Sequence, residues 1–304
     1  MQTRALGQLQ VSVVGLGCNN FGGRIDYDAT VAVIDAALDA GINFFDTADV
    51  YGGNGKSEEF MGRALQGRRD RVLIATKFGN KMDGAGEGAH PDYIRVAVEN
   101  SLRRLQTDVI DLYQIHKPDP TVPIADTLGA LDELVKAGKV REIGCSNYTA
   151  DMLRESEAVT RSGAARYESV QNHYSMLTRD PESDGVLAEC ARQGLAFLPY
   201  FPLEKGILTG KFRQGQDVPQ GTRLTNRPEE LTEDRLAKVE KLIAFAEARG
   251  HTILELAFSW LLTRPTVASV IAGATKPEQI FANVAAADWT LFDADLQEID
   301  SLLA

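Results

Sequence analysis

The feature that most constrains the fold of this chain is a regular alternation of short apolar runs with longer segments of helical periodicity. The longer segments repeat apolar residues at spacings of three and four, as Val31, Ile34 and Leu38 do, which is typical of amphipathic helices. The short runs are predicted to be strands at residues 13–17, 43–46, 73–77, 110–116, 142–146, 169–172, 196–200 and 269–272. Strands that alternate with helices build right-handed βαβ units and a parallel sheet.

Eight such units favour closure of the sheet into a (β/α)8 TIM barrel, and an open, doubly wound sheet is the alternative. Barrels of this kind use about 250 residues as one domain, which suits a chain of 304 residues. No Pro- or Ser-rich linker or low-complexity tract divides the sequence. We therefore expect residues 1–304 to form a single (β/α)8 barrel domain.

Two segments fall outside the strand-helix repeat. Residues 4–11 are predicted to form a small hairpin, with Gly7 and Gln8 at its turn, that plugs the floor of the barrel. Residues 201–232, after the seventh strand, form a long stretch rich in Gly, Pro, Arg and Gln, followed by helices at 233–249 and 252–263. A loop this long is more often a functional lid than a simple connection.

The charge of the chain limits the partners we expect. The formal net charge is −11, so attraction to nucleic acid or to an anionic membrane surface is not expected. No uncharged apolar run approaches the roughly 18 residues of a membrane span, and the N-terminus lacks the apolar stretch of a signal peptide. These features predict a cytoplasmic protein with no membrane association.

The cysteines and histidines show no metal-binding pattern. Cys18, Cys145 and Cys190 are far apart and odd in number, which favours reduced thiols over a disulfide framework. The histidines outside the predicted strands are scattered without H-x-x-x-H spacing. We expect no metal site.

Ionisable side chains stand at the ends of neighbouring predicted strands. Asp46 closes the second strand, Lys77 the third and His116 the fourth, and Tyr51 follows in the loop after Asp46. Each residue alone has an ordinary explanation in packing or capping, but catalytic groups of parallel barrels gather at these strand ends. A lysine ammonium beside a phenol lowers the phenol's pKa from about 10, and histidine can donate a hydrogen bond to a carbonyl oxygen.

Several segments resemble the aldo-keto reductase family. Residues 43–52, NFFDTADVYG, resemble the family's signature around its aspartate and tyrosine. Residues 75–79, ATKFG, resemble its lysine strand, and residues 111–116, DLYQIH, its histidine strand. Residues 138–147, GKVREIGCSN, are similar to its fifth-strand motif. The likeness extends to about Asn283, and the motifs occur in the family's order.

The resemblance implies a catalytic tetrad of Asp46, Tyr51, Lys77 and His116, in which Tyr51 protonates a carbonyl while NADPH supplies hydride. It also implies a cofactor site, with the long loop as its clasp. The implied cofactor-binding residues are Ser146, Asn147, Gln171, Tyr200, Pro202, Leu203, Lys205, Gly206, Lys211, Gly273, Thr275, Lys276, Gln279 and Asn283.

The residues around Lys276 resemble the family's site for the 2′-phosphate of NADPH, at a loop that leads into a helix. The amides of a helix N-terminus attract phosphate, and Lys276 adds a point charge. Gln279 stands where many members carry arginine, and Ala282 replaces a frequent glutamate. NADPH is therefore favoured, with NADH as a possible second cofactor.

Other residues near these motifs have less specific explanations. By resemblance, Asn19, Phe21 and Phe78 border the substrate. The Gly-rich run at residues 15–23 fails the dinucleotide-binding pattern G-x-G-x-x-G, because an asparagine takes the third glycine's place. Trp260 and Trp289 are expected in the core, and Tyr174 fits the pocket wall and the core equally well.

Two further functions compete with reduction of a small-molecule carbonyl compound. Some relatives of this family are cofactor-binding regulatory subunits of ion channels. Barrel aldolases use a strand-end lysine to form a Schiff base, and Lys77 holds such a place. The sequence does not distinguish among individual substrates, reaction directions or oligomeric states.

Overall fold

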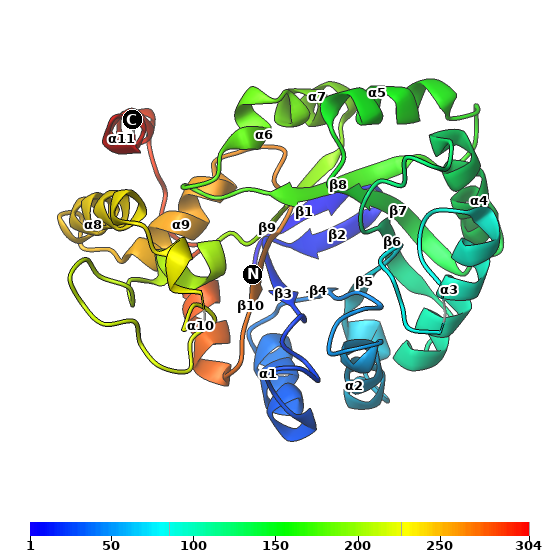
Figure 1. Ribbon diagram of the computed structural model, residues 1–304, viewed down its shortest axis with the longest axis horizontal. Helices are drawn as coiled ribbons and strands as arrows, with labels where there is room; N and C mark the ends of the chain where they lie inside the picture. The colour runs from blue at the N-terminus through cyan, green and yellow to red at the C-terminus, as the bar shows by residue number, and fades with distance from the viewer. Residues whose placement is uncertain (85, 226, 304) are drawn as a thin grey trace.

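The computed structural model describes residues 1–84, 86–225 and 227–303, in which eight parallel strands form a ring (Figure 1). Their order around the ring is β10-β3-β4-β5-β6-β7-β8-β9. The strands are β3 (Val14–Gly17), β4 (Phe44–Asp46), β5 (Leu73–Phe78), β6 (Ile110–Ile115), β7 (Val140–Ser146), β8 (Tyr167–His173), β9 (Ala196–Tyr200) and β10 (Val270–Gly273). Each predicted strand is confirmed, with ends that differ by a few residues.

The ring closes next to β10, so the open, doubly wound alternative is wrong. The amide of Phe197 in β9 donates to the carbonyl of Thr266 at 2.7 Å, and the amide of Ala268 donates back to Phe197 at 3.1 Å. On its other side β10 pairs in parallel with β3. The eight strands therefore enclose a barrel, as the alternation of strands and helices predicts.

A short hairpin seals the N-terminal end of the barrel. Strands β1 (Thr3–Leu6) and β2 (Leu9–Ser12) pair antiparallel around a two-residue turn, as predicted. Gly7 in this turn has a φ of +54°, which glycine adopts at little cost. The apolar side chains of the hairpin pack against the interior of the barrel, including Phe44 and Leu198. The opposite end, where the strands end, is the one at which catalytic groups of parallel barrels gather.

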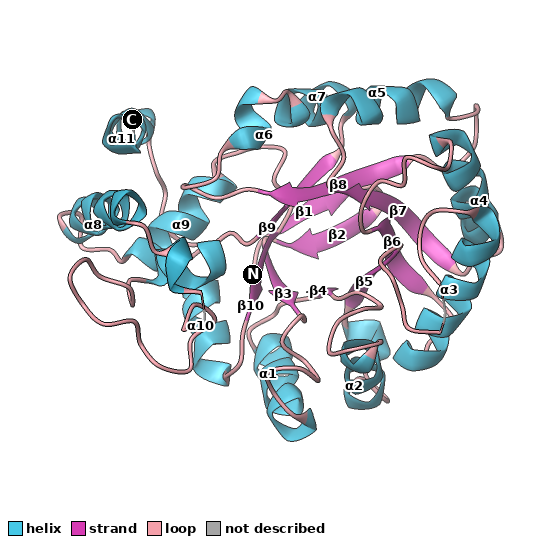
Figure 2. Ribbon diagram, viewed as in Figure 1, coloured by secondary structure: helices cyan, strands magenta, loops and turns pink. Residues whose placement is uncertain are grey.

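Helices surround the barrel (Figure 2). They are α1 (Tyr27–Asp39), α2 (Lys56–Ala64), α3 (Pro91–Leu105), α4 (Ile124–Lys136), α5 (Ala150–Val159), α6 (Asp180–Ser183), α7 (Val186–Gln193), α8 (Glu233–Glu247), α9 (Ile253–Leu262), α10 (Pro277–Ala285) and α11 (Asp293–Leu303). Several begin at a side-chain cap; Thr252, for example, accepts from the amide of Glu255, whose carboxylate accepts in turn from Thr252.

The main core lies between the strands and the surrounding helices. Trp260 is fully buried there, as expected, and Tyr174 packs against both Trp260 and Phe197. Tyr174 is thus a packing residue rather than a pocket wall. Trp289 is partly buried and stacks on His251 at 4.0 Å between ring centroids.

The long segment after β9 contains two short 3-10 helices, η2 (Glu204–Thr209) and η3 (Pro228–Glu230), before α8 and α9 begin. Cys18, Cys145 and Cys190 are buried and form no disulfide. No helix in the described ranges is both long and apolar enough to span a membrane.

Candidate active site

The loop after β4 brings Tyr51 back over the end of the barrel. The backbone of this loop runs along β5, because the amide of Thr47 donates to the carbonyl of Ala75 and the amide of Asp49 donates to the carbonyl of Lys77. The amide of Tyr51 then donates to Ala48 at 3.1 Å, which closes a turn. The phenol is thereby fixed above the end of β4 instead of extending into solvent.

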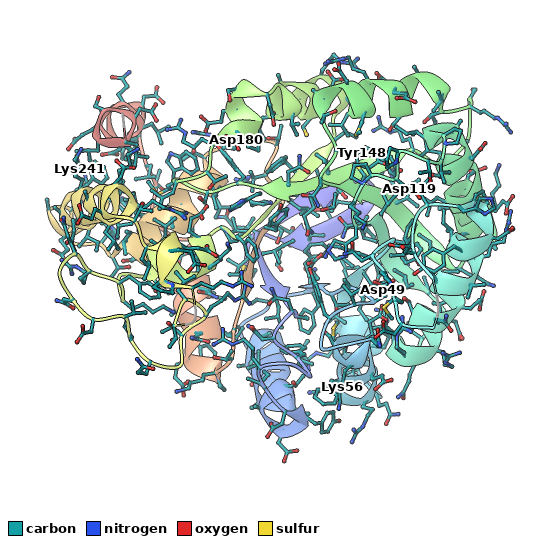
Figure 3. The ribbon with its side chains drawn as sticks, in the orientation of Figure 1. Asp49, Lys56, Asp119, Tyr148, Asp180 and Lys241 are labelled. Carbon is teal, nitrogen blue, oxygen red and sulfur yellow. The ribbon has the colours of Figure 1, made fainter. Side chains whose placement is uncertain are left out.

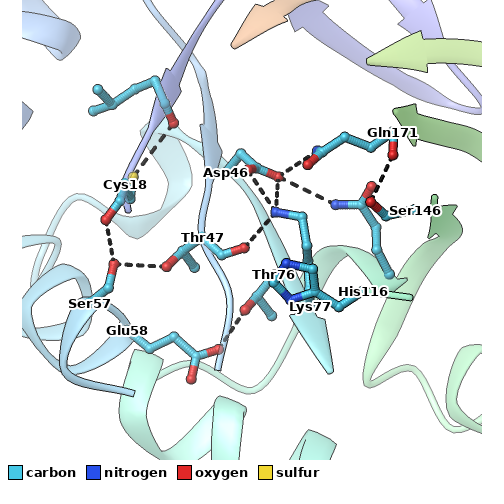
Figure 4. Close-up of polar contacts among 12 residues, drawn as sticks. Cys18, Asp46, Thr47, Ser57, Glu58, Thr76, Lys77, His116, Ser146 and Gln171 are labelled. Carbon is cyan, nitrogen blue, oxygen red and sulfur yellow. Dashed lines mark hydrogen bonds and ion pairs between the residues drawn. The ribbon is translucent and has the colours of Figure 1, made fainter. Parts of the chain in front are cut away.

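Asp46 and Lys77 form a buried ion pair beneath this loop (Figure 4). Lys77 Nζ donates to both carboxylate oxygens of Asp46 at 2.7 Å and to the carbonyl of Thr47 at 2.9 Å. The carboxylate also accepts a hydrogen bond from Gln171 Nε2 at 3.0 Å. A buried charge with this many partners is held in one position.

The pair keeps the amine of Lys77 charged. Burial by itself lowers the pKa of Lys77, but the Asp46 carboxylate and its hydrogen bonds outweigh burial and leave that pKa above its usual value. The Lys77 side chain is 0% exposed. Schiff-base chemistry needs a neutral and accessible amine, so this geometry disfavours a lyase.

Tyr51 lies directly over the ion pair. Lys77 Nζ is 5.4 Å from the centroid of the Tyr51 ring. Burial raises the pKa of Tyr51 above 10, and the opposing effect of the Lys77 ammonium is smaller. The expectation that Lys77 brings the pKa of Tyr51 below its ordinary value is therefore wrong for the protein without a bound cofactor. The phenol keeps its proton, and the ammonium reduces the cost of giving it up.

His116 faces Tyr51 across the end of the barrel. The two rings meet edge to face with centroids 5.8 Å apart, and the amide of His116 donates to Phe78 at 2.8 Å. Burial, together with the charges of Lys77 and Lys117, lowers the pKa of His116 to about 3. The imidazole is therefore neutral at ordinary pH and can serve as a hydrogen-bond donor without a charge.

A cavity of about 970 Å³ opens beside these residues. Asp46, Tyr51 and His116 reach it, whereas Lys77 lies beneath the surface. Every residue that the resemblance assigned to the cofactor lines the cavity: Ser146, Asn147, Gln171, Tyr200, Pro202, Leu203, Lys205, Gly206, Lys211, Gly273, Thr275, Lys276, Gln279 and Asn283. Its size is within the range of small-molecule and cofactor sites, about 300–1,000 Å³.

The three residues expected to border the substrate are not brought together. Asn19 lines the cavity. Phe21 and Phe78 are fully buried and lie outside its lining, in the core between strands and helices. Phe78 stacks on Tyr113 at 4.8 Å between ring centroids. Successive side chains of a strand point to opposite faces, so Phe78 must point away from the interior that Lys77 occupies.

Two arginines of the cavity wall were missed by reasoning from the sequence. Arg223 donates to Asn19 Oδ1 at 3.3 Å and to Asn20 Oδ1 at 3.1 Å, and Arg24 donates to the carbonyl of Gly221 at 3.0 Å. These contacts draw the segment after β9 across the cavity toward β3. The arginine content of that segment was a sequence signal for Arg223 but not for Arg24, which lies between β3 and α1.

Arg24, Arg223 and Lys211 form a cationic group in the cavity wall. Within the described ranges, no carboxylate lies within ion-pair distance of any of the three. Burial lowers the pKa of Lys211 and of Arg223, and the neighbouring positive charges lower both further. Cations that destabilise one another in this way favour an anionic ligand.

The start of α10 forms another part of the wall. Lys276 precedes this helix, and Thr275 and Gln279 also face the cavity. Gln279 Oε1 accepts hydrogen bonds from the amide of Thr275 at 2.7 Å and from its hydroxyl at 3.2 Å. Gln279 therefore occupies polar groups that would otherwise be available to a phosphate at the helix N-terminus.

A second buried acid lies in the loop between β4 and Tyr51. Asp49, labelled beside α2 in Figure 3, is 1% exposed, and its Oδ1 has no hydrogen-bond partner within the described residues. Glu58 is also buried, and its carboxylate accepts hydrogen bonds from Arg104 Nε at 2.7 Å and from Thr76 Oγ1 at 2.6 Å. Burial and the nearby Glu58 raise the pKa of Asp49 to about 7.

Comparison with known proteins places these features in one family. The model of the aldo/keto reductase family matches residues 13–304. An aldo-keto reductase of Bacillus subtilis, YhdN, is 36% identical over 97% of this chain and 91% of its own length. The Schizosaccharomyces pombe aldo-keto reductase yakc [NADP(+)] is 34% identical over 98% of this chain and 90% of its own. The structure of a glycerol dehydrogenase from Gluconobacter oxydans superposes with a TM-score of 0.86 at 31% identity, covering 99% of this chain and 94% of that one.

Proposed function

The chain belongs to the aldo/keto reductase family, an oxidoreductase family that acts on carbonyl and alcohol groups, and from this premise we propose that it is an NADPH-dependent reductase of an aldehyde or ketone. Tyr51 is the general acid, and Asp46, Lys77 and His116 support it. The observation that carries the proposal is the buried Asp46–Lys77 pair, with its ammonium 5.4 Å from the Tyr51 ring at the edge of an open cavity.

The residues of the cavity fit a nicotinamide dinucleotide. Ser146, Asn147 and Gln171 offer amide and hydroxyl groups close to the catalytic residues, and Tyr200 offers an aromatic face. Lys211 and Arg223, which have no carboxylate partner among the described residues, suit its phosphates. When bound, NADPH supplies the hydride that reduces the carbonyl carbon. The name of the fission-yeast relative includes NADP(+), which supports the same cofactor.

The protein's own groups would divide the proton chemistry among them. Tyr51 donates its proton to the carbonyl oxygen as negative charge develops there, and the Lys77 ammonium stabilises the resulting phenolate. Asp46 holds that ammonium charged and in place. Neutral His116 donates a hydrogen bond that orients the carbonyl oxygen. In the direction of alcohol oxidation Tyr51 takes the proton back.

Cofactor preference should be for NADPH over NADH, but by a modest factor. Lys276 and the amides at the start of α10 supply positive potential for the 2′-phosphate. Gln279 is uncharged and already accepts hydrogen bonds from Thr275, so a second cation is missing from this position. A family member with arginine here would have a bidentate phosphate contact that this chain lacks.

The test is oxidation of NADPH by the purified protein with a panel of aldehydes and ketones, compared with Tyr51→Phe. The variant should lose about 100-fold or more in kcat/KM for each compound that the protein reduces. Tyr27→Phe is a matched control, because the partly buried Tyr27 packs on Phe60 outside the cavity. Turnover that survives Tyr51→Phe undiminished would exclude Tyr51 as the acid.

A further inference from the structure

The loops after β3, β5 and β6 give the cavity a polar wall beside the catalytic residues. They contribute Asn19, Asn80 and Lys117 to its lining. In the described part of the chain from β3 to Lys117, the cavity lining includes no aliphatic side chain, and its only aromatic rings are those of Tyr51 and His116. A wall of this kind gains little from an apolar substrate and suits a substrate with polar or charged groups.

Lys117 has a fixed place next to His116. The amide of His116 donates to the carbonyl of Phe78 at 2.8 Å, and its carbonyl accepts from Asn147 Nδ2 at 2.9 Å. Pro118 follows Lys117, and a proline disfavours the helical conformation in the residue before it. Burial is the main cause of the low pKa of His116, and the positive charge of Lys117 contributes to it. The ammonium group of Lys117 therefore belongs to the catalytic end of the cavity.

Lys117 has no carboxylate partner in the part of the chain that the structure describes. The lysines that form ion pairs there are Lys77, Lys136, Lys139, Lys205 and Lys238. Asp119 is the acid nearest to Lys117 in sequence, but its Oδ1 accepts from Thr121 Oγ1 at 2.6 Å and its Oδ2 accepts from the amide of Ala89 at 2.9 Å. The hydrogen bond from Thr121 lowers the pKa of Asp119 most, and the charge of Lys117 lowers it less. The charge of Lys117 is thus open to a ligand.

The cofactor does not account for this charge. The cations of the cavity lining are Arg24, Lys117, Lys205, Lys211, Arg223 and Lys276. Lys205 is paired with Glu230. The cationic group of Arg24, Lys211 and Arg223 suits the phosphates of a dinucleotide, as does Lys276 at the start of α10. Lys117 remains, at the end of the cavity where the carbonyl group would be reduced.

We propose that Lys117 is a specificity-determining residue that binds an anionic group of the substrate, so that the preferred substrates are short aldehydes or ketones that carry a carboxylate or a phosphate. The inference rests on the proposed function, which places the carbonyl group at Tyr51 and His116. Because Lys117 directly follows His116, the anionic group must lie only a few atoms from the carbonyl carbon. Asn19 and Asn80 offer hydrogen bonds to its oxygen atoms or to hydroxyl groups between them.

The charge of a substrate can be removed while its carbon chain is kept. Succinate semialdehyde is a short aldehyde with a carboxylate, and its methyl ester is the uncharged counterpart. In the unmodified protein, kcat/KM for oxidation of NADPH should be about tenfold higher with the anion than with the ester, or about 1.4 kcal/mol. The difference should lie mainly in KM, because the ammonium group of Lys117 contacts the substrate away from the reacting atoms.

Lys117→Met keeps a long side chain and removes its charge. In this variant the ratio of kcat/KM for the anion to kcat/KM for the ester should fall from about ten to about one. The ester, measured in the same variant, accounts for any general damage to the cavity. A ratio near one in the unmodified protein, or a ratio that stays near ten in Lys117→Met, would overturn the proposal.

Lys81→Met is the matched control. Lys81 is exposed, follows Asn80 in the loop after β5, and forms no ion pair within the described ranges, but it does not line the cavity. Its removal changes the net charge of the protein by the same amount, so the ratio should remain about ten. An equal fall in Lys81→Met would show a general attraction of anions to this end of the barrel and would refute a specific contact with Lys117.

A titration without cofactor separates failure of this inference from failure of the proposed function. Succinate, which cannot be reduced, should shift the NMR resonances of the His116 ring in the unmodified protein and in Lys81→Met, and its Kd should be about tenfold higher in Lys117→Met. A His116 ring that does not respond to succinate refutes the anion site even if aldehydes are reduced. If NADPH is oxidised with no carbonyl compound, the proposed function fails, whereas a response of His116 that depends on Lys117 still supports the anion site.

Discussion

Replacement of Asp49 by Asn should change how the stability of the protein depends on pH. The Asp49 carboxyl group is surrounded by buried neighbours and has an oxygen with no hydrogen-bond partner within the described residues. The titratable and charged groups that act on it are Glu58 on α2, Arg104 on α3 and Lys77 on β5, and it acts in turn on the pKa of Tyr93 and Tyr113. Arg104, the one arginine in this group, is already paired with Glu58, so the negative charge of an ionised Asp49 is poorly balanced.

The magnitude follows from the raised pKa. Folding raises the pKa of Asp49 from 3.8 to about 7, so the folded state holds its proton more tightly. The stability that this proton contributes is fully present below pH 3.8 and is lost as the pH rises to about 7. Between about pH 5.5 and pH 8.5, only the part up to the pKa of about 7 contributes to the loss, which is roughly 1.5 pH units. At 1.36 kcal/mol per unit, the loss of stability is about 2 kcal/mol. Asn cannot ionise and should not show this loss.

The assay is urea unfolding of the protein and of Asp49→Asn at about pH 5.5 and pH 8.5, at constant ionic strength. The free energy of unfolding of the variant, relative to the unmodified protein, should increase by about 2 kcal/mol from the lower to the higher pH. Asp70→Asn, in the exposed turn before β5, serves as the control and should show no such change. A stability difference that does not vary with pH would refute the assignment of the titration to Asp49.

Two further predictions concern helix packing and His116. Gly62→Ala should lower the free energy of unfolding by about 1–3 kcal/mol in urea titrations, because the added Cβ would lie 2.4 Å from the carbonyl oxygen of Arg104. Gly129 is a helical position with open space around it, so Gly129→Ala should raise the free energy of unfolding by about 0.5–1 kcal/mol. The imidazole of His116, with a pKa of about 3, should keep the NMR shifts of its neutral form from pH 8 down to about pH 4.5. Its contribution to stability should be lost only as the pH falls from 6.5 toward 3. An NMR titration of the imidazole with its midpoint near 6.5 would contradict its burial.

The sequence was sufficient to predict the barrel and the group of residues at its open end. Periodicity located the strands, and in a parallel barrel the residues at strand ends must meet at one end. Asp46, Lys77 and His116 therefore come together by topology, before any side-chain detail is known. The family motifs placed the expected cofactor-binding residues at the cavity in the same way, because each motif sits at the end of its strand.

The sequence could not predict features that depend on the path of the long segment after β9. Arg24 and Arg223 are about two hundred residues apart and share one cavity wall only because the segment folds back across the barrel. That path is set by specific ion pairs, such as Lys205 with Glu230, whose partners have no regular spacing. By contrast, strand alternation could have predicted that Phe78 lies outside the cavity, since the neighbouring Lys77 points inward.

The direction of the Tyr51 pKa shift was also outside the reach of sequence reasoning. The motif indicates that an ammonium lies near the phenol, and this lowers the pKa. It does not indicate how deeply the phenol is buried, and here burial is the larger influence and acts in the opposite direction.

The central claim is that Lys77 promotes reduction through the proton of Tyr51, and a double-mutant cycle on the single-turnover rate of NADPH oxidation tests it most directly. Lys77→Met should slow this step about 100-fold in the unmodified protein and less than about threefold in the Tyr51→Phe background, since no phenolate forms there. Damage from leaving Asp46 unpaired is common to both backgrounds and cancels in the comparison. Equal losses in the two backgrounds would show that Lys77 acts independently of Tyr51 and would contradict the mechanism.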